Sequence, residues 1–244
     1  DYWWTENLEF DSPVGSTCLW MDDHNRVHNV YCHGSNQTNL IFGIRCTLTH
    51  CRSDDASWYG FNGSTGTELD SCTAIGNGLD GFYLTSSEIW VTHCIAHNNG
   101  TNGFRFNGYQ AHMLDCLSDG NTHSGVHQDH STGSLVGGRC ILSNNGTYGI
   151  ETDADNRSVQ DYDNHFYNNT SGDVDGTGPQ GGKTTGDPLF ADYANDDFRL
   201  NPGSPASHLQ FGSQFVTDSW GAKGPIQTRR PVLVHPGMDG GLRG

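Results

Sequence analysis

Small and apolar residues recur along the chain at an interval close to 22 residues, and cysteine marks the clearest case. Five cysteines stand at Cys51, Cys72, Cys94, Cys116 and Cys140, and a glycine comes nine positions after each of them. A second column, two positions after the cysteines, contains Phe10, Cys32, Ser53, Ala74, Ala96, Ser118, Leu142 and Phe166. A spacing of two places side chains on one face of a β-strand, so both columns predict strands with the same side turned inward.

Turn signals separate these strands. Asn-Asn-Gly occurs at 98–100 and at 144–146, and Asn77-Gly78 occupies the equivalent place in an earlier repeat. A helical repeat is disfavoured, because glycine and asparagine are dense and no apolar period of 3.6 residues appears. The pattern predicts an all-β parallel β-helix, a solenoid of about seven coils of roughly 22 residues whose strands stack about 4.8 Å apart.

The cysteine column has a structural explanation within such a coil. Small, polarisable side chains stack well in a narrow interior. Parallel Cβ vectors hold neighbouring sulfurs poorly for a disulfide, and a linear file does not converge on one point as a zinc site requires. We therefore expect reduced core cysteines, and the histidines show no metal-ligand spacing either.

The composition changes near residue 171 to a stretch rich in glycine, threonine and proline. Asp187-Pro188-Leu189-Phe190 follows, and later Phe-Arg-Leu-Asn-Pro-Gly-Ser-Pro-Ala at 198–206. Both phrases resemble the closing segment of right-handed parallel β-helix repeat proteins of the pectate-lyase-like superfamily, over roughly residues 1–225. That superfamily includes polysaccharide lyases, glycoside hydrolases, sugar epimerases and phage tailspikes, so the resemblance implies a right-handed fold and does not choose an activity.

We predict three segments on this basis. Residues 1–170 form the parallel β-helix coils, 171–225 form an irregular closing segment packed on the helix, and 226–244 form an extended C-terminal arm. An outward row of Ile95, Leu117 and Ile141 is apolar, which indicates cover by the C-terminal arm or by another chain. No cap sequence precedes Asp1, so we expect a missing N-terminal part or a neighbouring chain or domain at that end.

Charge narrows the choice of partners. The net charge is −16 and only two residues are lysine, Lys183 and Lys223, which argues against nucleic acid. No stretch approaches the length of apolar sequence that a membrane span needs. We expect an extracellular, secreted protein or one on a virion surface, with polysaccharide as its partner, and with other chains of a homo-oligomer or virion as further candidates.

Candidate chemistry lies on one outward face. Counted from the cysteine column, one outward row reads Leu19, Ile41, Asn62, Tyr83, Arg105, His127, Glu151 and Asp175, and the next reads Met21, Gly43, Ser64, Thr85, Asn107, Asp129 and Asp153. In both rows the charged residues are concentrated in the later coils, from Arg105 onward. The candidate catalytic residues are His127, Asp129, Glu151 and Asp153, and the candidate substrate-binding residues are Tyr83, Arg105 and Asn107.

These side chains allow more than one chemistry. Asp129 and Glu151 could form a glycosidase pair, and repulsion between Asp129 and Asp153 should raise the pKa of at least one, as a general acid requires. His127 could act as a base or orient a carboxylate. The carboxylates could instead hold Ca²⁺ as a cofactor, which would suit a lyase acting on uronates. The resemblance implies a Lys or Arg base for such a lyase, and only Arg105 faces this surface. A purely solvated set of charges is the third interpretation.

Two functions therefore remain open. One is an enzyme, a polysaccharide lyase or glycoside hydrolase, either secreted or carried on a tailspike that degrades polysaccharide. The other is a non-catalytic structural or adhesin β-helix in a virion or cell-surface assembly. The carboxylate cluster favours the first, and the expected neighbours at both ends favour the second.

Overall fold

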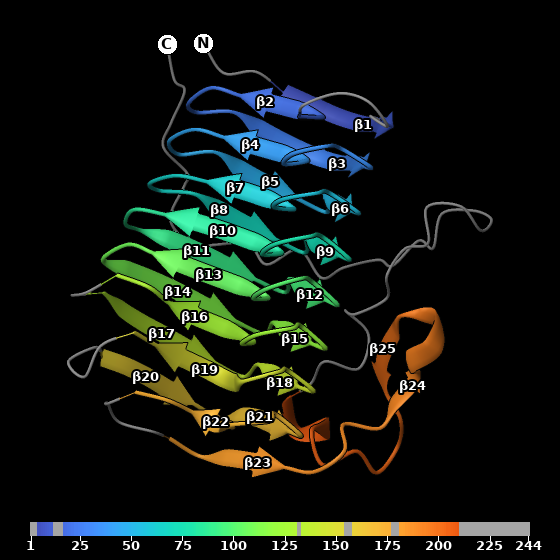
Figure 1. Ribbon diagram of the computed structural model, residues 1–244, viewed down its shortest axis with the longest axis vertical. Helices are drawn as coiled ribbons and strands as arrows, with labels where there is room; N and C mark the ends of the chain where they lie inside the picture. Colours follow the sequence, from blue (N-terminus) through green and yellow to red (C-terminus); the bar gives the residue numbers. More distant parts are fainter. Residues whose placement is uncertain (1–3, 12–16, 131–132, 154–157, 177–180, 210–244) are drawn as a thin grey trace, which may run out of the picture.

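The computed structural model describes residues 4–11, 17–130, 133–153, 158–176 and 181–209. The chain winds into a stack of parallel coils along the long axis of the molecule (Figure 1). This confirms the all-β parallel β-helix. Within the described residues, no helix is long and apolar enough to cross a membrane.

Three faces run along the stack. Face 1 is the eight-stranded sheet of β2 (Leu19–Met21), β4 (Leu40–Phe42), β7 (Phe61–Gly63), β10 (Phe82–Thr85), β13 (Phe104–Asn107), β16 (Val126–Gln128), β19 (Tyr148–Thr152) and β22 (Gly172–Val174). The fifteen-stranded sheet divides into two arms, because β3 (Arg26–His33), which also pairs with β1 (Trp4–Asp11), pairs with both β5 and β6.

The two arms form the other faces. Face 2 contains β5 (Thr47–Thr49), β8 (Glu68–Asp70), β11 (Ile89–Thr92), β14 (Gln110–Leu114), β17 (Ser134–Gly138) and β20 (Ser158–Tyr162). Face 3 contains β6 (Arg52–Asp54), β9 (Thr73–Ile75), β12 (Ile95–His97), β15 (Leu117–Asp119), β18 (Ile141–Ser143), β21 (Asn164–Tyr167) and β23 (Lys183–Thr185).

A single left-handed residue turns the chain from face 2 to face 3 in each coil. These residues are Asn7, Asn29, His50, Ser71, His93, Asp115, Arg139 and Asp163, with φ between 52° and 57°. Asparagine, aspartate and histidine are the non-glycine residues that adopt this conformation most readily, and most positions in the file hold one of them. The cysteine column follows immediately, which places each sulfur at the start of the next inward-facing strand.

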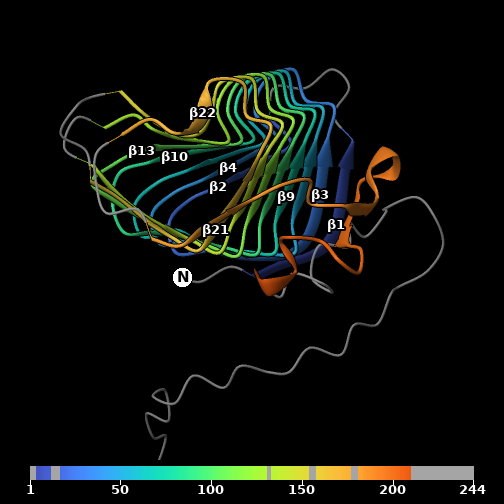
Figure 2. The same ribbon diagram turned by 90° about the horizontal axis from the view of Figure 1, so that it is seen from below.

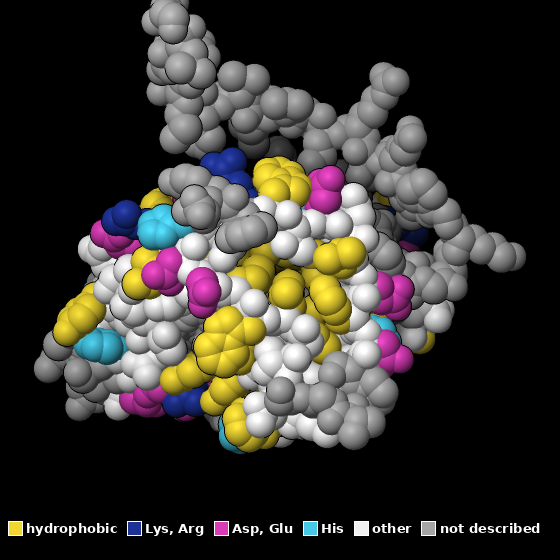
Figure 3. All heavy atoms as spheres, turned by 90° about the horizontal axis from the view of Figure 1, so that it is seen from above, with side chains coloured by type: hydrophobic (Ala, Val, Ile, Leu, Met, Phe, Trp, Pro, Cys, Tyr) yellow, Lys and Arg dark blue, Asp and Glu magenta, His cyan; other side chains and the backbone are white. Residues whose placement is uncertain are grey.

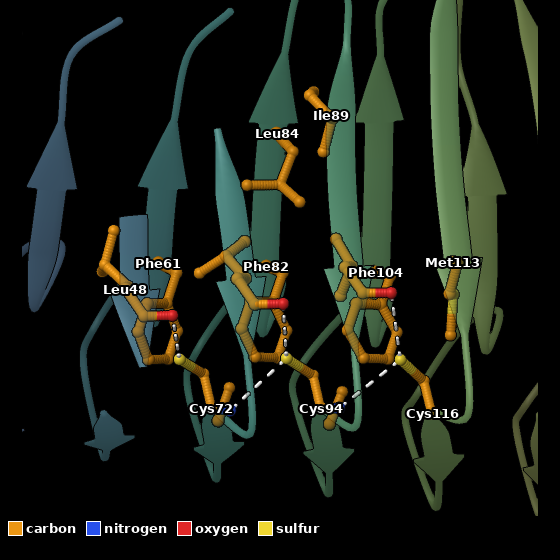
Figure 4. Close-up of a cluster of buried hydrophobic side chains, with 14 of the residues drawn as sticks. Leu48, Phe61, Cys72, Phe82, Leu84, Ile89, Cys94, Phe104, Met113 and Cys116 are labelled. Atoms are coloured by element: carbon orange, nitrogen blue, oxygen red, sulfur yellow. Dashed lines mark hydrogen bonds between the residues drawn. The ribbon is translucent and has the colours of Figure 1, made fainter. Parts of the chain in front are cut away.

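Identical side chains stack inside the coils (Figure 4). The rings of Phe61, Phe82 and Phe104 lie 4.7 Å apart from centroid to centroid and nearly parallel. Beside them the cysteines form the predicted file, and Cys72 and Cys94 are fully buried and free. Burial raises the pKa of both thiols, so they stay neutral.

An asparagine ladder closes the turn between face 3 and face 1. The Nδ2 of Asn99 donates to Oδ1 of Asn121 at 2.9 Å, and the Nδ2 of Asn121 donates to Oδ1 of Asn145 at 3.0 Å. Asn77 and Asn169 extend the ladder by one coil on either side. Each buried amide thus satisfies the next, which offsets the cost of burying it. Asn99 and Asn145 belong to glycosylation sequons, yet both are buried.

The C-terminal segment covers face 3 (Figure 2). The antiparallel pair β24 (Phe190–Asp192) and β25 (Asp197–Leu200) carries the 3-10 turn η1 (Tyr193–Asn195), and η2 (Ser207–Leu209) follows. Phe198, Ala206 and Leu209 bury the apolar row of Ile95, Leu117 and Ile141. The expected cover was the arm 226–244 or another chain. The arm lies outside the described residues, and the cover comes from an earlier segment.

A buried polar contact accompanies this cover. His97 and Asp119 of face 3 are 2% and 0% exposed, and Nδ1 of His97 lies 3.1 Å from Oδ2 of Asp119. The hydroxyl of Tyr193 donates to the same Asp119 oxygen at 2.7 Å. Coil pairing also continues past residue 170 through β22 and β23. The segment boundaries at 170 and 225 stay a prediction.

In the first coil, the observed strand pairing differs from the two outward rows predicted from the sequence. Trp20, not Leu19, pairs with Ile41, and Met21 pairs with Phe42 and is buried. The cause is local, because one residue more separates Leu8 from Trp20 than separates Val30 from Ile41.

Hydrophobic side chains gather over the first coil at the N-terminal end of the stack (Figure 3). The exposed large hydrophobic residues of this coil are Trp4, Leu8 and Trp20, at 61%, 42% and 70%. A partner or a preceding segment at this end stays a prediction.

The ladder yields a stability test. We expect Asn121→Ala to lower the free energy of unfolding by about 2–4 kcal/mol, because it removes an amide that both donates and accepts and takes one acceptor from the backbone and side-chain amides of Asn99. Chemical denaturation measures the change. Thr122→Ala is the matched control, because its side chain is exposed, and it should change the unfolding free energy by less than about 0.5 kcal/mol. Equal effects of the two substitutions would contradict the ladder's role.

Candidate functional site

The predicted site residues lie on face 1 in the expected register. Tyr83 pairs with Arg105, Arg105 pairs with His127, and His127 pairs with Glu151. Their neighbours along each strand are buried, so alternation turns these four outward. Asn107 stands at the end of β13 opposite Thr85 and is half-buried.

Arg105 is the centre of one half of the site. Its Nε donates to Oδ2 of Asp129 at 3.0 Å, and its Nη1 lies 3.8 Å from Oδ2 of Asp80. The guanidinium carbon lies 5.3 Å from the ring centroid of Tyr83, a cation–π distance. Burial alone would lower the pKa of Arg105, but the hydrogen bond and charge of Asp129, with Asp80, outweigh it and raise that pKa.

Asp80 and Tyr59 belong to this half of the site, although the sequence did not predict them. Asp80 is 1% exposed, and its Oδ1 accepts from the backbone and side-chain amides of Asn102 at 3.0 and 2.9 Å. The ring of Tyr59 stacks on that of Tyr83 at 4.7 Å. Both residues come from the turn before a face 1 strand, where counting by strand alternation does not apply. Their shared spacing from Gly60 and Gly81 could have signalled them.

His127 is the centre of the other half. Its Nε2 lies 2.6 Å from Oδ1 of Asp153, which follows the end of β19. One ligand atom each from His127, Asp129 and Asp153 falls within 4.8 Å of the others. The structure thus brings together three of the four predicted catalytic residues.

Glu151 is engaged elsewhere. Its Oε2 accepts hydrogen bonds from the hydroxyls of Ser124 and Thr147, which lie near the starts of β16 and β19. Asp129, by contrast, follows the end of β16. The glycosidase pairing of Asp129 with Glu151 stays a prediction, and the structure assigns the two carboxylates to separate sets of partners.

The ionisation of Asp129 differs from expectation. Burial acts to raise its pKa, but hydrogen bonds with Asp153 and Arg105 and the positive charge of Arg105 outweigh it, so the pKa is lowered. Repulsion was expected to raise the pKa of at least one of Asp129 and Asp153, and for Asp129 the shift has the opposite direction. A lowered pKa keeps Asp129 ionised at neutral pH, which does not suit a general acid.

His127, Asp129 and Asp153 could also hold a cation. One nitrogen and two carboxylates could share an ion, whereas Ca²⁺ prefers six to eight oxygen ligands. A cation at Asp129 would compete with Arg105, which donates to the same carboxylate. Binding of Ca²⁺ stays a prediction.

Comparison with known families agrees with the coil geometry. A family model described as the right handed beta helix region matches residues 21–182, more than half of the chain. The chain belongs to this family. As in any right-handed β-helix protein, fold alone does not choose the activity. The match includes every predicted site residue from Tyr83 to Asp153 and ends before the segment that covers face 3. Among curated proteins, no sequence matches this right-handed β-helix chain.

The ion pair predicts a pH dependence. We expect Arg105→Met to raise the pKa of Asp129, because the variant loses the guanidinium that favours the carboxylate. A lowered folded-state pKa stabilises the protein above the unfolded value, about 3.9, and this stabilisation is lost as pH falls through the folded pKa. The stability advantage of the wild type over Arg105→Met should therefore shrink below about pH 4.

Carbon NMR of the side-chain carboxyls measures the titration directly. Arg139→Met is the control, since Arg139 pairs with Asp115 at a different edge of the coils. It should leave the titration of Asp129 unchanged. The same Asp129 curve in the wild type and Arg105→Met would show that the guanidinium does not set this pKa.

Proposed function

We propose that this right-handed β-helix protein binds a polysaccharide along face 1 and cleaves it with His127 as the base. One observation carries the proposal. A stacked tyrosine pair, an arginine and a hydrogen-bonded His–Asp pair follow one another along successive coils of this face. Aromatic rings offer an apolar surface to sugars, and the polar groups beside them fix orientation.

The His127–Asp153 contact suits general base chemistry. The carboxylate orients the imidazole and stabilises the protonated ring that forms when His127 accepts a proton. Its contact is at Nε2, which leaves Nδ1 for a water or for a sugar C–H. In a hydrolase His127 would deprotonate water, and in a lyase it would remove a proton from the sugar ring. Asp153 acts on the substrate through His127 and is a positioning residue.

The position of Arg105 suits a role in substrate binding. Its guanidinium lies between Asp129 and Asp80 and over Tyr83, so its position is fixed before a ligand arrives. In an acidic polysaccharide, a sugar carboxylate would take its place beside Arg105 in competition with Asp129. The resemblance of the closing segment to the pectate-lyase-like superfamily supports a polysaccharide substrate. Because such polymers lie outside cells, we place the protein in the extracellular space or on a virion surface.

The second candidate is a non-catalytic adhesin or structural β-helix. The ion pair of Arg105 with Asp129 favours it, because charges that satisfy one another stabilise a surface without any chemistry. The exposed apolar residues over the first coil also suit contact with another chain of a homo-oligomer or virion.

Cleavage assays on a panel of acidic and neutral polysaccharides decide between the two. New reducing ends would report hydrolysis, and the ultraviolet absorbance of an unsaturated uronate would report elimination. We expect His127→Ala to lower the cleavage rate at least 100-fold with polymer binding retained, the usual contribution of a general base. Asp153→Asn should lower the rate less and shift its dependence on pH.

His123→Ala is the matched control, because this histidine is exposed in the turn before β16. It should cleave like the wild type. Binding without cleavage by the wild type would establish the adhesin. Loss of cleavage in Glu151→Gln with full activity in His127→Ala would overturn the assignment of the base.

A further inference from the structure

Trp90 of β11 presents a supported aromatic ring on face 2. The side chain is 45% exposed, and its ring stacks on that of His112 at 4.0 Å with an interplanar angle of 10°. His112 pairs with Trp90 from the following coil, so it covers one face of the indole. Burial lowers the pKa of His112, which keeps this supporting ring uncharged at neutral pH.

A shallow depression lies on the other side of the indole. It has a volume of about 360 Å³ and is lined by Arg45, Thr47, Gly66, Glu68, Glu88 and Trp90. These residues come from β5, β8, β11 and the turns that lead into them, and His112 is not among them. The open face of the indole is therefore one wall of the depression.

Gly66 keeps the depression open. It adopts φ +69°, and a Cβ built there would lie 2.9 Å from Cγ of Arg45. Arg45 occupies the equivalent position one coil earlier, and its backbone also has a left-handed conformation. Its side chain lines the depression. A side chain at residue 66 would displace that arginine and fill the space.

The charged groups of the depression are free to meet a ligand. Within the described ranges, the side chains of Arg45, Glu68 and Glu88 make no hydrogen bond or ion pair with the protein. Four other arginines of the described residues are paired with aspartate, namely Arg52, Arg105, Arg139 and Arg199. The guanidinium of Arg45 and the carboxylates of Glu68 and Glu88 thus lie around the flat apolar ring of Trp90.

We infer that this depression binds one pyranose unit of a neutral polysaccharide. The C–H face of the sugar lies on Trp90, its hydroxyls donate to Glu68 and Glu88, and Arg45 donates to a hydroxyl oxygen. An anion would meet two carboxylates, and a cation would meet Arg45, so a neutral ring with hydroxyls matches the donors and acceptors best. The choice of a saccharide rests on the proposed function, whereas the site itself lies on another face from His127.

A sugar-binding site at Trp90, in addition to the site on face 1, would hold the polymer near the protein. A polymer held at Trp90 remains near the protein while its other segments reach face 1, which raises their effective concentration there. Binding at Trp90 would therefore assist cleavage at His127 but does not require it.

Calorimetric titration with maltohexaose, cellohexaose and mannohexaose tests the inference. We expect at least one hexaose to bind the wild type, and Trp90→Ala to weaken that binding about tenfold. Trp90→Phe, which keeps a smaller ring, should weaken it less, and Glu68→Gln should also weaken it.

Trp58→Ala is the matched control, because Trp58 is 49% exposed and lies outside the depression. An unchanged unfolding midpoint in each variant shows that the coils are intact. Equal affinities of Trp90→Ala and Trp58→Ala, or no binding of any neutral hexaose to the wild type, would overturn the inference. Preference for the cationic hexaose of glucosamine would overturn the neutral ligand class. Loss of binding in Tyr83→Ala with full binding in Trp90→Ala would support the face 1 site and overturn this one.

Discussion

Vertical register between coils is the constraint on which the structure depends. Each strand hydrogen-bonds to its equivalent one coil away, and many buried polar side chains also find a partner in the next coil. The buried amides of Asn99 and Asn121 make their shortest side-chain hydrogen bonds, or bonds as short as any other, to the equivalent asparagine of the next coil, which presents the same group at the same height. A slip of one residue would leave a whole file unpaired, so the ladder fixes the alignment that the outward faces inherit.

Sequence periodicity predicted the fold and the positions that depend on strand alternation alone. Tyr83, Arg105 and His127 were assigned to one file because each lies at a fixed distance from a cysteine. Prediction failed where a turn intervenes. An extra residue in the first coil shifted Leu19 and Met21. Asp129 and Asp153 follow strand ends, where alternation no longer sets direction, so their partners could not be read from spacing. Hydrogen bonds with Asp153 and Arg105 lower the pKa of Asp129, whereas repulsion was expected to raise the pKa of Asp129 or of Asp153.

The three faces have become chemically distinct on one repeated backbone. Face 1 gathers the ion pair and the His–Asp contact, face 2 leaves Trp90 and its charged neighbours open, and face 3 is covered. The repeat permits this division because inward positions alone determine stacking, while outward positions vary from coil to coil. Substitutions of outward residues can thus change the function of one face without altering the stacked side chains of the interior.

The cover over face 3 has a consequence for cooperativity. In a solenoid each coil contacts only its neighbours, so a stack can open locally at any point along its length. Phe198 and Leu209 touch a row drawn from three successive coils, and they are synthesised after all of them. Docking of this segment must therefore be among the last steps of folding. Once docked, it couples those coils into a single unit that opens together or not at all.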